Sequence, residues 1–185
     1  FFFKQKTAYE ITTRLVGSRY LDPDGSFPNH IPNPENETAM QSILDAVQES
    51  KADLGIIFDT DVDRAGAVLS DGTELNRNRI IAMMAAILLR EHPGTTIVTD
   101  SITSTGLAAF IRKHGGVHHR FKRGYRNVIN ESMRLNREGH DSQLAMETSG
   151  HGALKENYFL DDGAYLVSKI LVQMAKLRRE GRTIG

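Results

Sequence analysis

The chain has 185 residues, of which 39% are hydrophobic and 25% charged, and its acidic and basic residues balance to zero net charge. This composition is ordinary for a soluble globular protein of one large domain or two small ones. The absence of cysteine excludes disulfides, thiol catalysis and thiolate metal sites. A neutral chain generates no long-range field for nucleic acid or an anionic membrane, and no apolar stretch reaches the roughly 18 residues of a membrane span. We therefore expect a cytoplasmic protein without nucleic-acid or membrane partners.

The amino-terminal segment is unusual. Residues Phe1 to Ile11 resemble the translation of a sequencing-adapter primer. They also lack the layout of a signal peptide, because the apolar residues come first and no small-residue cleavage site follows. We expect residues 1–18 to be a non-native leader that packs poorly, with the native start of the protein missing and the carboxy-terminal end cut as well.

Helices and strands alternate along the rest of the chain. An extended, proline-rich loop over 21–34 comes first. Apolar spacing and capping residues, with Asn36 as the first N-cap, predict helices over 35–50, 78–90, 104–113, 125–137 and 163–179. Branched and aromatic runs predict strands over 54–58, 65–69, 95–99, 117–121 and 143–146. This alternation favours an α/β fold with mostly parallel sheets.

Three aspartates, Asp59, Asp61 and Asp63, alternate directly after a predicted apolar strand. The ends of strands are where open α/β sheets bind ligands. Three carboxylates converging on one point favour a hard divalent cation such as Mg²⁺. An EF-hand loop counted from Asp59 fails, because its sixth and twelfth positions hold Arg64 and Ser70 instead of Gly and Glu. A solvated turn remains the alternative to a metal site.

A second strand end leads into the segment 147–152. Its two glycines allow close approach of backbone and ligand. Glu147 is suited to accept hydrogen bonds from sugar hydroxyls, and His151 is suited to donate, accept or shuttle a proton near neutral pH. A turn with a surface histidine is the alternative.

A basic segment over 121–126 surrounds Gly124 with Lys122, Arg123 and Arg126 at a strand-to-helix junction. Helix N-termini and cationic side chains favour anions such as phosphate. A solvated basic turn is the alternative. Nucleic acid is disfavoured, because the patch is isolated and lacks interleaved aromatic residues.

Two residue pairs invite simpler explanations. His118 and His119 are adjacent on a predicted strand, so they point to opposite faces and cannot easily share one metal ion. We expect one of them to pack inward and the other to be exposed. Asp161 and Asp162 precede the last helix and are expected to cap it.

These segments together resemble the α-D-phosphohexomutases, most closely the bacterial-type phosphomannomutase/phosphoglucomutases. The segment 59–64 is similar to the family's metal-binding loop, and 147–151 to its sugar-recognition loop. The segments 27–36 and 121–129 resemble the loop into the second domain's helix and a third-domain segment that approaches the substrate. The resemblance covers residues 20–185. It implies two consecutive α/β domains of four, with mixed, mostly parallel sheets flanked by helices: residues 19–76 form a partial metal-binding domain and 77–185 the sugar-recognition domain.

The resemblance implies a mechanism. A phosphoserine gives its phosphoryl group to a hexose 1- or 6-phosphate, and the resulting hexose bisphosphate reorients and returns the other phosphate. Mg²⁺ neutralises charge on the transferred group. The implied roles are metal ligation by Asp59, Asp61 and Asp63, phosphoryl contact by Arg64, sugar binding by Glu147 and Ser149, substrate contact and proton transfer by Lys122 and His151, and weaker substrate contact by Arg126.

The chain also departs from the family's pattern. The phosphoserine segment and the carboxy-terminal phosphate-binding domain are absent, so we expect the chain alone to be inactive. Thr60 and Val62 stand where many members have glycine, which alters loop stiffness more than ligand supply. Sugar preference and oligomeric state stay open.

Two alternatives remain open. One is an aspartyl-phosphate phosphatase, with Asp59 and Asp61 after the strand and with Lys122 and the pair 161–162 in the supporting roles. The other is a non-catalytic module that binds a phosphosugar or nucleotide.

Overall fold

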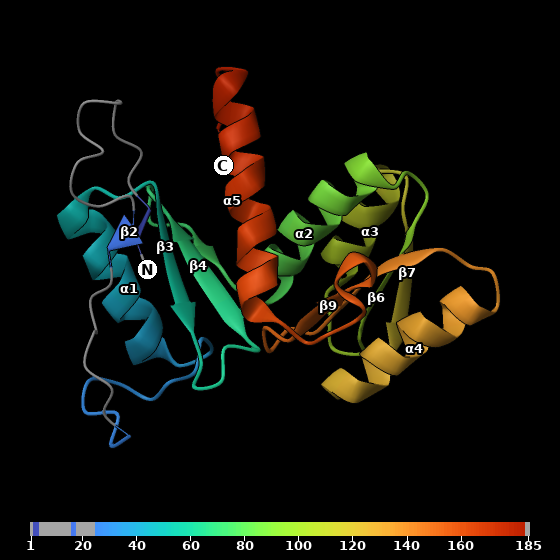
Figure 1. Cartoon of the computed structure of the whole chain (residues 1–185), viewed down its shortest axis with the longest axis horizontal. Coiled ribbons are helices and arrows are strands. Elements are labelled where there is room, and N and C mark those ends of the chain that lie inside the picture. Colours follow the sequence, from blue (N-terminus) through green and yellow to red (C-terminus); the bar gives the residue numbers. More distant parts are fainter. Residues whose placement is uncertain (1, 4–15, 18–24, 184–185) are drawn as a thin grey trace.

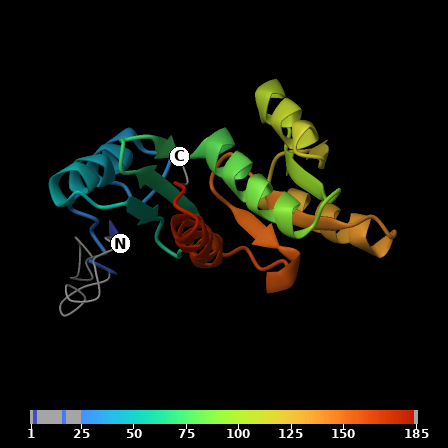
Figure 2. The same ribbon diagram turned by 90° about the horizontal axis from the view of Figure 1, so that it is seen from above.

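The computed structural model describes residues 2–3, 16–17 and 25–183. Two β-sheets and five α-helices make up this described part, and helices α2 and α5 lie between the sheets (Figure 1). The turned view in Figure 2 shows the same separation of the two sheets. No helix within the described ranges is long and apolar enough to cross a membrane.

The first sheet has the strand order β2-β1-β3-β4-β5, and all its neighbouring strands are antiparallel. Its strands are β1 (Phe2–Phe3), β2 (Val16–Gly17), β3 (Leu54–Phe58), β4 (Ala65–Leu69) and β5 (Glu74–Leu75). Most of the expected leader, residues 1–18, lies outside the described residues. Its two described pieces form β1 and β2, and β1 pairs with β3.

Helix α1 (Glu37–Ser50) covers one face of the first sheet. As predicted, Asn36 caps it: the side chain accepts a hydrogen bond of 3.1 Å from the Ala39 amide. The helix packs closely because Gly55 on β3 has no side chain. A Cβ at that position would collide with side-chain carbons of Val47 and Ile43. The loop 59–64, called the aspartate loop below, therefore follows a strand that is packed firmly against α1.

The second sheet has the order β7-β6-β8-β9, with parallel pairs except for the antiparallel pair β8–β9. Its strands are β6 (Thr96–Asp100), β7 (Val117–Phe121), β8 (Ser142–Met146) and β9 (Gly152–Leu154). Helices α2 (Arg77–Glu91) and α3 (Thr105–Lys113) contribute to one core cluster with this sheet, and α4 (Tyr125–Arg137) to another. Alternate residues of β6 separate the two clusters: Ile97 belongs to the first and Val98 to the second.

One hydrophobic cluster spans both sheets. It joins Leu54 of β3 and Ile97 of β6 to the fully buried residues of α2, such as Met84, and to Leu166 of α5 (Gly163–Arg179). A single turn of 3₁₀ helix (Lys155–Asn157) leads from β9 toward α5. Because the two sheets share a core, the loops at their adjoining ends are fixed relative to each other.

The expected α/β class with mixed sheets is confirmed, and the parallel pairing is confined to the second sheet. The physical reason is connection length: the loop 59–64 joins β3 to β4 directly, and a connection this short permits only antiparallel pairing. The helical crossovers α3 and α4 make the parallel pairs. The short strands β5 and β9 were not predicted, because two or three residues carry little periodic signal.

Two smaller expectations need correction. His118 and His119 do face different partners, since one contacts Thr99 at 2.8 Å and the other Glu131 at 2.9 Å, but both are half-buried and neither is exposed. Of the acidic pair before α5, only Asp162 caps the helix, accepting a 2.9 Å hydrogen bond from the Tyr165 amide. The other member, Asp161, contacts His151 instead.

Candidate active site

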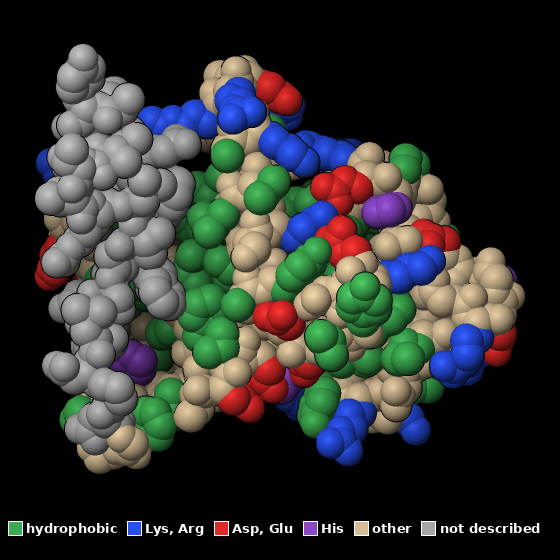
Figure 3. Space-filling model, viewed as in Figure 1, with side chains coloured by type: hydrophobic (Ala, Val, Ile, Leu, Met, Phe, Trp, Pro, Cys, Tyr) green, Lys and Arg blue, Asp and Glu red, His purple; other side chains and the backbone are tan. Residues whose placement is uncertain are grey.

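The loop between β3 and β4 brings its three aspartates together. One carboxylate oxygen from each of Asp59, Asp61 and Asp63 lies within 4.8 Å of the other two. Asp59 is buried, Asp63 is half-buried and Asp61 is exposed. In the space-filling view, acidic side chains gather on the lower part of this face, below α5 (Figure 3). The alternation predicted from sequence thus corresponds to a compact group of oxygens.

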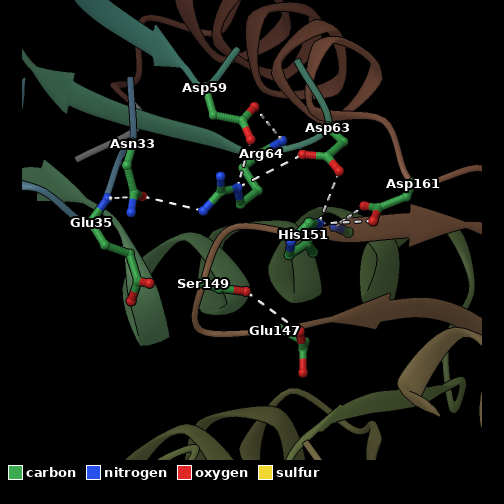
Figure 4. Close-up of polar contacts among 10 residues, drawn as sticks. Asn33, Glu35, Asp59, Asp63, Arg64, Glu147, Ser149, His151 and Asp161 are labelled. Atoms are coloured by element: carbon green, nitrogen blue, oxygen red, sulfur yellow. Dashed lines mark hydrogen bonds and ion pairs between the residues drawn. The ribbon is translucent and has the colours of Figure 1, made fainter. Parts of the chain in front are cut away.

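Arg64 closes the aspartate loop on Asp59. Its Nε donates to Asp59 Oδ2 at 2.6 Å and its backbone amide to Asp59 Oδ1 at 3.1 Å (Figure 4). Burial opposes ionisation of Asp59, but these hydrogen bonds outweigh it and hold the pKa of Asp59 below its usual value. The Arg64 guanidinium also donates to Asn33 Oδ1 at 3.4 Å. Asp59 is therefore a fixed anion.

Asp63 is the aspartate-loop residue that contacts His151, next to the second sheet. Its Oδ2 is 3.4 Å from His151 Nδ1, while its Oδ1 is buried without a hydrogen-bond partner among the described residues. Burial and the adjacent Asp59 carboxylate raise the pKa of Asp63 to about 6. This oxygen forms an ion pair with Arg64 Nε at 3.8 Å, which is too long for a hydrogen bond, so its lone pairs stay available to a closer cation.

The donor set fits a hard divalent cation. Asp59, Asp61 and Asp63 supply oxygen ligands only, which suits Mg²⁺ rather than a soft metal. The unbonded Oδ1 of Asp63 gives one of these ligands a spare lone pair. A second group, formed by Asp63, His151 and Asp161, is also close enough to share one ion. Its imidazole nitrogen is bonded to Asp161, so the all-oxygen group is the better fit for magnesium.

Val62 adopts a strained backbone conformation in the aspartate loop. Its φ is 66°, a left-handed value that β-branched residues rarely adopt. The Val62 carbonyl accepts a 3.0 Å hydrogen bond from the Gly163 amide at the start of α5, which holds the strained residue in place.

Replacing Val62 by glycine is expected to stabilise the folded chain by up to about 1 kcal/mol, because relief of the strain exceeds the entropic cost of glycine. Urea unfolding followed by circular dichroism measures the change. Val62→Ala keeps a Cβ in the left-handed region and should gain less. Equal or lower stability of Val62→Gly would contradict the strain argument.

The loop between β8 and β9 carries the second predicted group. The Glu147 amide donates to the His151 carbonyl at 2.9 Å, and the Gly150 amide donates to the Glu147 carbonyl at 3.1 Å. Gly150 has φ of 102°, and a Cβ there would lie 3.1 Å from the Ala65 carbonyl oxygen at the start of β4. Glycine is needed here both for its backbone conformation and for the close approach to the first sheet.

The two loops meet at His151. Its backbone forms a β-bridge with Arg64, and its Nδ1 lies 2.8 Å from Asp161 Oδ2. Burial favours neutral imidazole, but the hydrogen bond to Asp161 and the charges of Asp161 and Asp63 outweigh it and raise the pKa of His151. The ring stacks on Tyr125, with centroids 4.9 Å apart. The β-bridge, the contact with Asp161 and the stack on Tyr125 therefore fix the position of the His151 side chain.

The basic segment reaches the second loop through its backbone. The Gly124 amide donates to Glu147 Oε1 at 2.6 Å, and Ser149 Oγ lies 3.5 Å from Glu147 Oε2. Lys122 and Arg126 are exposed, and their cations lie over the rings of Phe121 and Tyr125.

The structure thus brings Glu147, Ser149 and His151 together with Asp63 and Arg64. Lys122 and Arg126 are exposed instead, and the contacts that the described residues give their cations are with Phe121 and Tyr125.

Sequence reasoning missed two residues that contact His151. Asp161 looked like half of a helix cap, and only the return of β9 brings it to the imidazole. Tyr125 was assigned only as the first residue of α4, and nothing in its local sequence marks the ring stack.

Comparisons with known proteins match both parts of the chain to one family. Residues 6–72 match the profile of phosphoglucomutase/phosphomannomutase alpha/beta/alpha domain II, and residues 76–184 match domain III. A phosphomannomutase/phosphoglucomutase from Pseudomonas syringae is 35% identical over 84% of the chain, and a phosphoglucomutase from Neisseria meningitidis is 33% identical over the same share. The chain spans about a third of the length of each of these relatives.

Solved structures give the same assignment. A phosphoglucomutase/phosphomannomutase family protein from Burkholderia thailandensis superposes with a TM-score of 0.74 at 33% identity, covering 84% of this chain and 33% of that protein. A putative phosphomannomutase from Thermus thermophilus, at 18% identity and a TM-score of 0.65, shares the fold. Because residues 6–72 and 76–184 match the profiles of domains II and III, this chain belongs to the phosphoglucomutase/phosphomannomutase family and covers these two of its domains.

Proposed function

We propose that the chain supplies the metal-binding and sugar-recognition parts of a phosphohexomutase that interconverts hexose 1-phosphates and hexose 6-phosphates through a hexose bisphosphate. The observation that carries the proposal is the contact between the aspartate loop and the loop 147–151, called the sugar loop below. Asp63 Oδ2 lies 3.4 Å from His151 Nδ1. A hexose phosphate bound at the sugar loop would have its reacting oxygen close to the aspartate group.

The residues of the aspartate loop have distinct proposed roles. Asp59, Asp61 and Asp63 would hold Mg²⁺, which when bound supplies positive charge to offset that of a phosphoryl group. Arg64 anchors Asp59 and keeps its second guanidinium edge near Asn33, from where it is suited to contact phosphoryl oxygens.

The sugar loop would recognise hydroxyls and handle the proton. The Glu147 carboxylate already accepts one hydrogen bond from the Gly124 amide, and its remaining lone pairs suit sugar hydroxyls, with Ser149 beside it. His151, oriented by Asp161 and supported by Tyr125, is placed to give or take a proton at the reacting hydroxyl. Lys122 and Arg126 would approach the substrate phosphate from the rim.

The geometry argues against an aspartyl-phosphate phosphatase. Both oxygens of Asp59 are bonded to Arg64, which makes it a poor nucleophile. Lys122 lies over the Phe121 ring, and Asp162 is used as a helix cap. We also propose that the chain alone does not turn over hexose phosphates, because its 185 residues lack the phosphoserine segment that the mechanism requires.

Binding of glucose 1-phosphate to the chain tests the sugar site. Glu147→Gln is expected to weaken binding about tenfold, since it removes a charged acceptor from the sugar hydroxyls. Glu37→Gln, the same change at an exposed position on α1, should leave the affinity unaltered. Titration in the presence of Mg²⁺, followed by NMR chemical shifts, gives the affinities. Equal affinities for the two variants would remove Glu147 from the site.

A further inference from the structure

Asp100 is the last residue of β6 and is fully buried. Its Oδ2 accepts two hydrogen bonds from Thr148 in the sugar loop, 3.1 Å from the backbone amide and 2.8 Å from the hydroxyl. The structure shows these two hydrogen bonds to the Asp100 carboxyl group. Asp100 does not cap the following helix α3, because Ser104 does so. A fully buried carboxyl group directed at one loop residue indicates a specific positioning task.

The position of Asp100 explains why a side chain is needed there. Pairing between β6 and β8 ends at Thr99 and Met146, so the chain leaves the sheet at Glu147 without ladder hydrogen bonds to β6. The Asp100 carboxylate reaches across this point and holds the next residue, Thr148. Two hydrogen bonds to one carboxyl oxygen thus fix Thr148 where the ladder hydrogen bonds have ended.

The other carboxylate oxygen of Asp100 has no hydrogen-bond partner among the described residues, although it is buried. An asparagine would keep one acceptor for Thr148. A buried carboxyl oxygen without a hydrogen-bond partner costs stability, which favours a role in the site over a role in the core.

Holding Thr148 orients both of its neighbours. Glu147 on one side contacts the Gly124 amide, and Ser149 on the other side contacts Glu147. Release of Thr148 would free the whole turn up to His151, whose carbonyl accepts from the Glu147 amide. We infer that Asp100 is a positioning residue that preorders the sugar-recognition loop. The effect that we expect on ligand binding rests on the proposed function, whereas the effect on the order of the loop does not.

Amide hydrogen exchange measured by NMR on the ligand-free chain tests the loop order directly. In Asp100→Asn, exchange at the Thr148 amide is expected to rise about tenfold relative to the wild type, and in Asp100→Ala by about a hundredfold. The matched control is Ser132→Ala, which removes another fully buried hydrogen bond, from Ser132 Oγ to Ser142 Oγ at the opposite end of the sheet. It should leave Thr148 protected.

The inference is overturned if the Thr148 amide exchanges no faster in Asp100→Ala than in Ser132→Ala after correction for global stability. If Asp100→Ala does not fold, Thr148→Val takes its place: it removes the hydroxyl donor and should raise exchange about tenfold at the Gly150 amide, which donates to the Glu147 carbonyl. Unchanged protection in Thr148→Val would equally contradict the role of Asp100.

Ligand binding separates this inference from the proposed function. Asp100→Asn should weaken glucose 1-phosphate binding about tenfold and leave Mg²⁺ affinity unchanged, because the hydrogen bonds of its side chain are to Thr148 of the sugar loop. If the wild type binds no hexose phosphate, the proposed function fails while the exchange result still decides the positioning role. If Asp100→Asn binds glucose 1-phosphate as the wild type does, the positioning role fails while the proposed function stands.

Discussion

Replacing Gly163 by alanine is expected to destabilise the chain by about 2–3 kcal/mol and to loosen the contact between the aspartate loop and helix α5. A Cβ at Gly163 would lie 2.8 Å from the Val62 carbonyl oxygen and 2.9 Å from the Arg64 carbonyl carbon. Both are backbone atoms, so they cannot move aside without displacing the loop. The displacement would also strain the hydrogen bond from the Gly163 amide to Val62.

A glycine in another helix provides the control. Gly106 lies in α3, where an added Cβ would meet only Ser104 Oγ, at the ordinary distance of 3.6 Å. Gly106→Ala is therefore expected to stabilise the chain by about 0.5–1 kcal/mol through helix propensity. Thermal unfolding should show shifts of opposite sign for the two variants. A shift of the same sign and size in both would mean that the close approach at Gly163 is not tight.

The affinity for Mg²⁺ is expected to fall about tenfold between pH 7 and pH 5. With the pKa of Asp63 raised to about 6, roughly nine in ten Asp63 carboxyls are ionised at pH 7 and only one in ten at pH 5. Because the metal binds the carboxylate, it competes with the proton. A carboxyl with the usual pKa of 3.8 would stay ionised over this range and give almost no change.

Calorimetric titration at pH 5, 6 and 7 and constant ionic strength measures this dependence. Asp63→Asn should bind Mg²⁺ more weakly and with little dependence on pH. The same pKa shift affects the metal-free fold with a definite sign: the folded carboxyl holds its proton more tightly than the unfolded one. The stability it contributes is therefore present below about pH 3.8 and is lost as pH rises through 6. A flat wild-type Mg²⁺ titration would contradict the assignment of Asp63 as a perturbed metal ligand.

Much of the fold could be predicted because its signals are local. The N-cap at Asn36 and the apolar strand before Asp59 were both visible in the sequence, and both are present in the structure. The antiparallel pairing of the first sheet was less evident, since the sequence shows the strands but not which of them are neighbours.

The residues that hold the candidate site residues in place could not be predicted, because only the fold brings them together. Asp161 reaches His151 only after β9 has paired with β8. Gly163 looks like any first residue of a helix until the Val62 carbonyl lies against it. Asp100 looks like the polar end of a strand, and its bond to Thr148 joins residues 48 positions apart. Local patterns predicted candidate site residues, but not the residues that hold them in place.

The most direct test of the account is the affinity of the chain for Mg²⁺ in two variants that each lose one carboxylate. Asp61→Asn removes an exposed member of the aspartate group, whereas Asp45→Asn removes an exposed carboxylate on α1 that accepts a hydrogen bond from Gln41. We expect Asp61→Asn to weaken Mg²⁺ binding at least about tenfold, and Asp45→Asn to bind as the wild type does. The same Mg²⁺ affinity in both variants would contradict the assignment of the β3–β4 loop as the metal site.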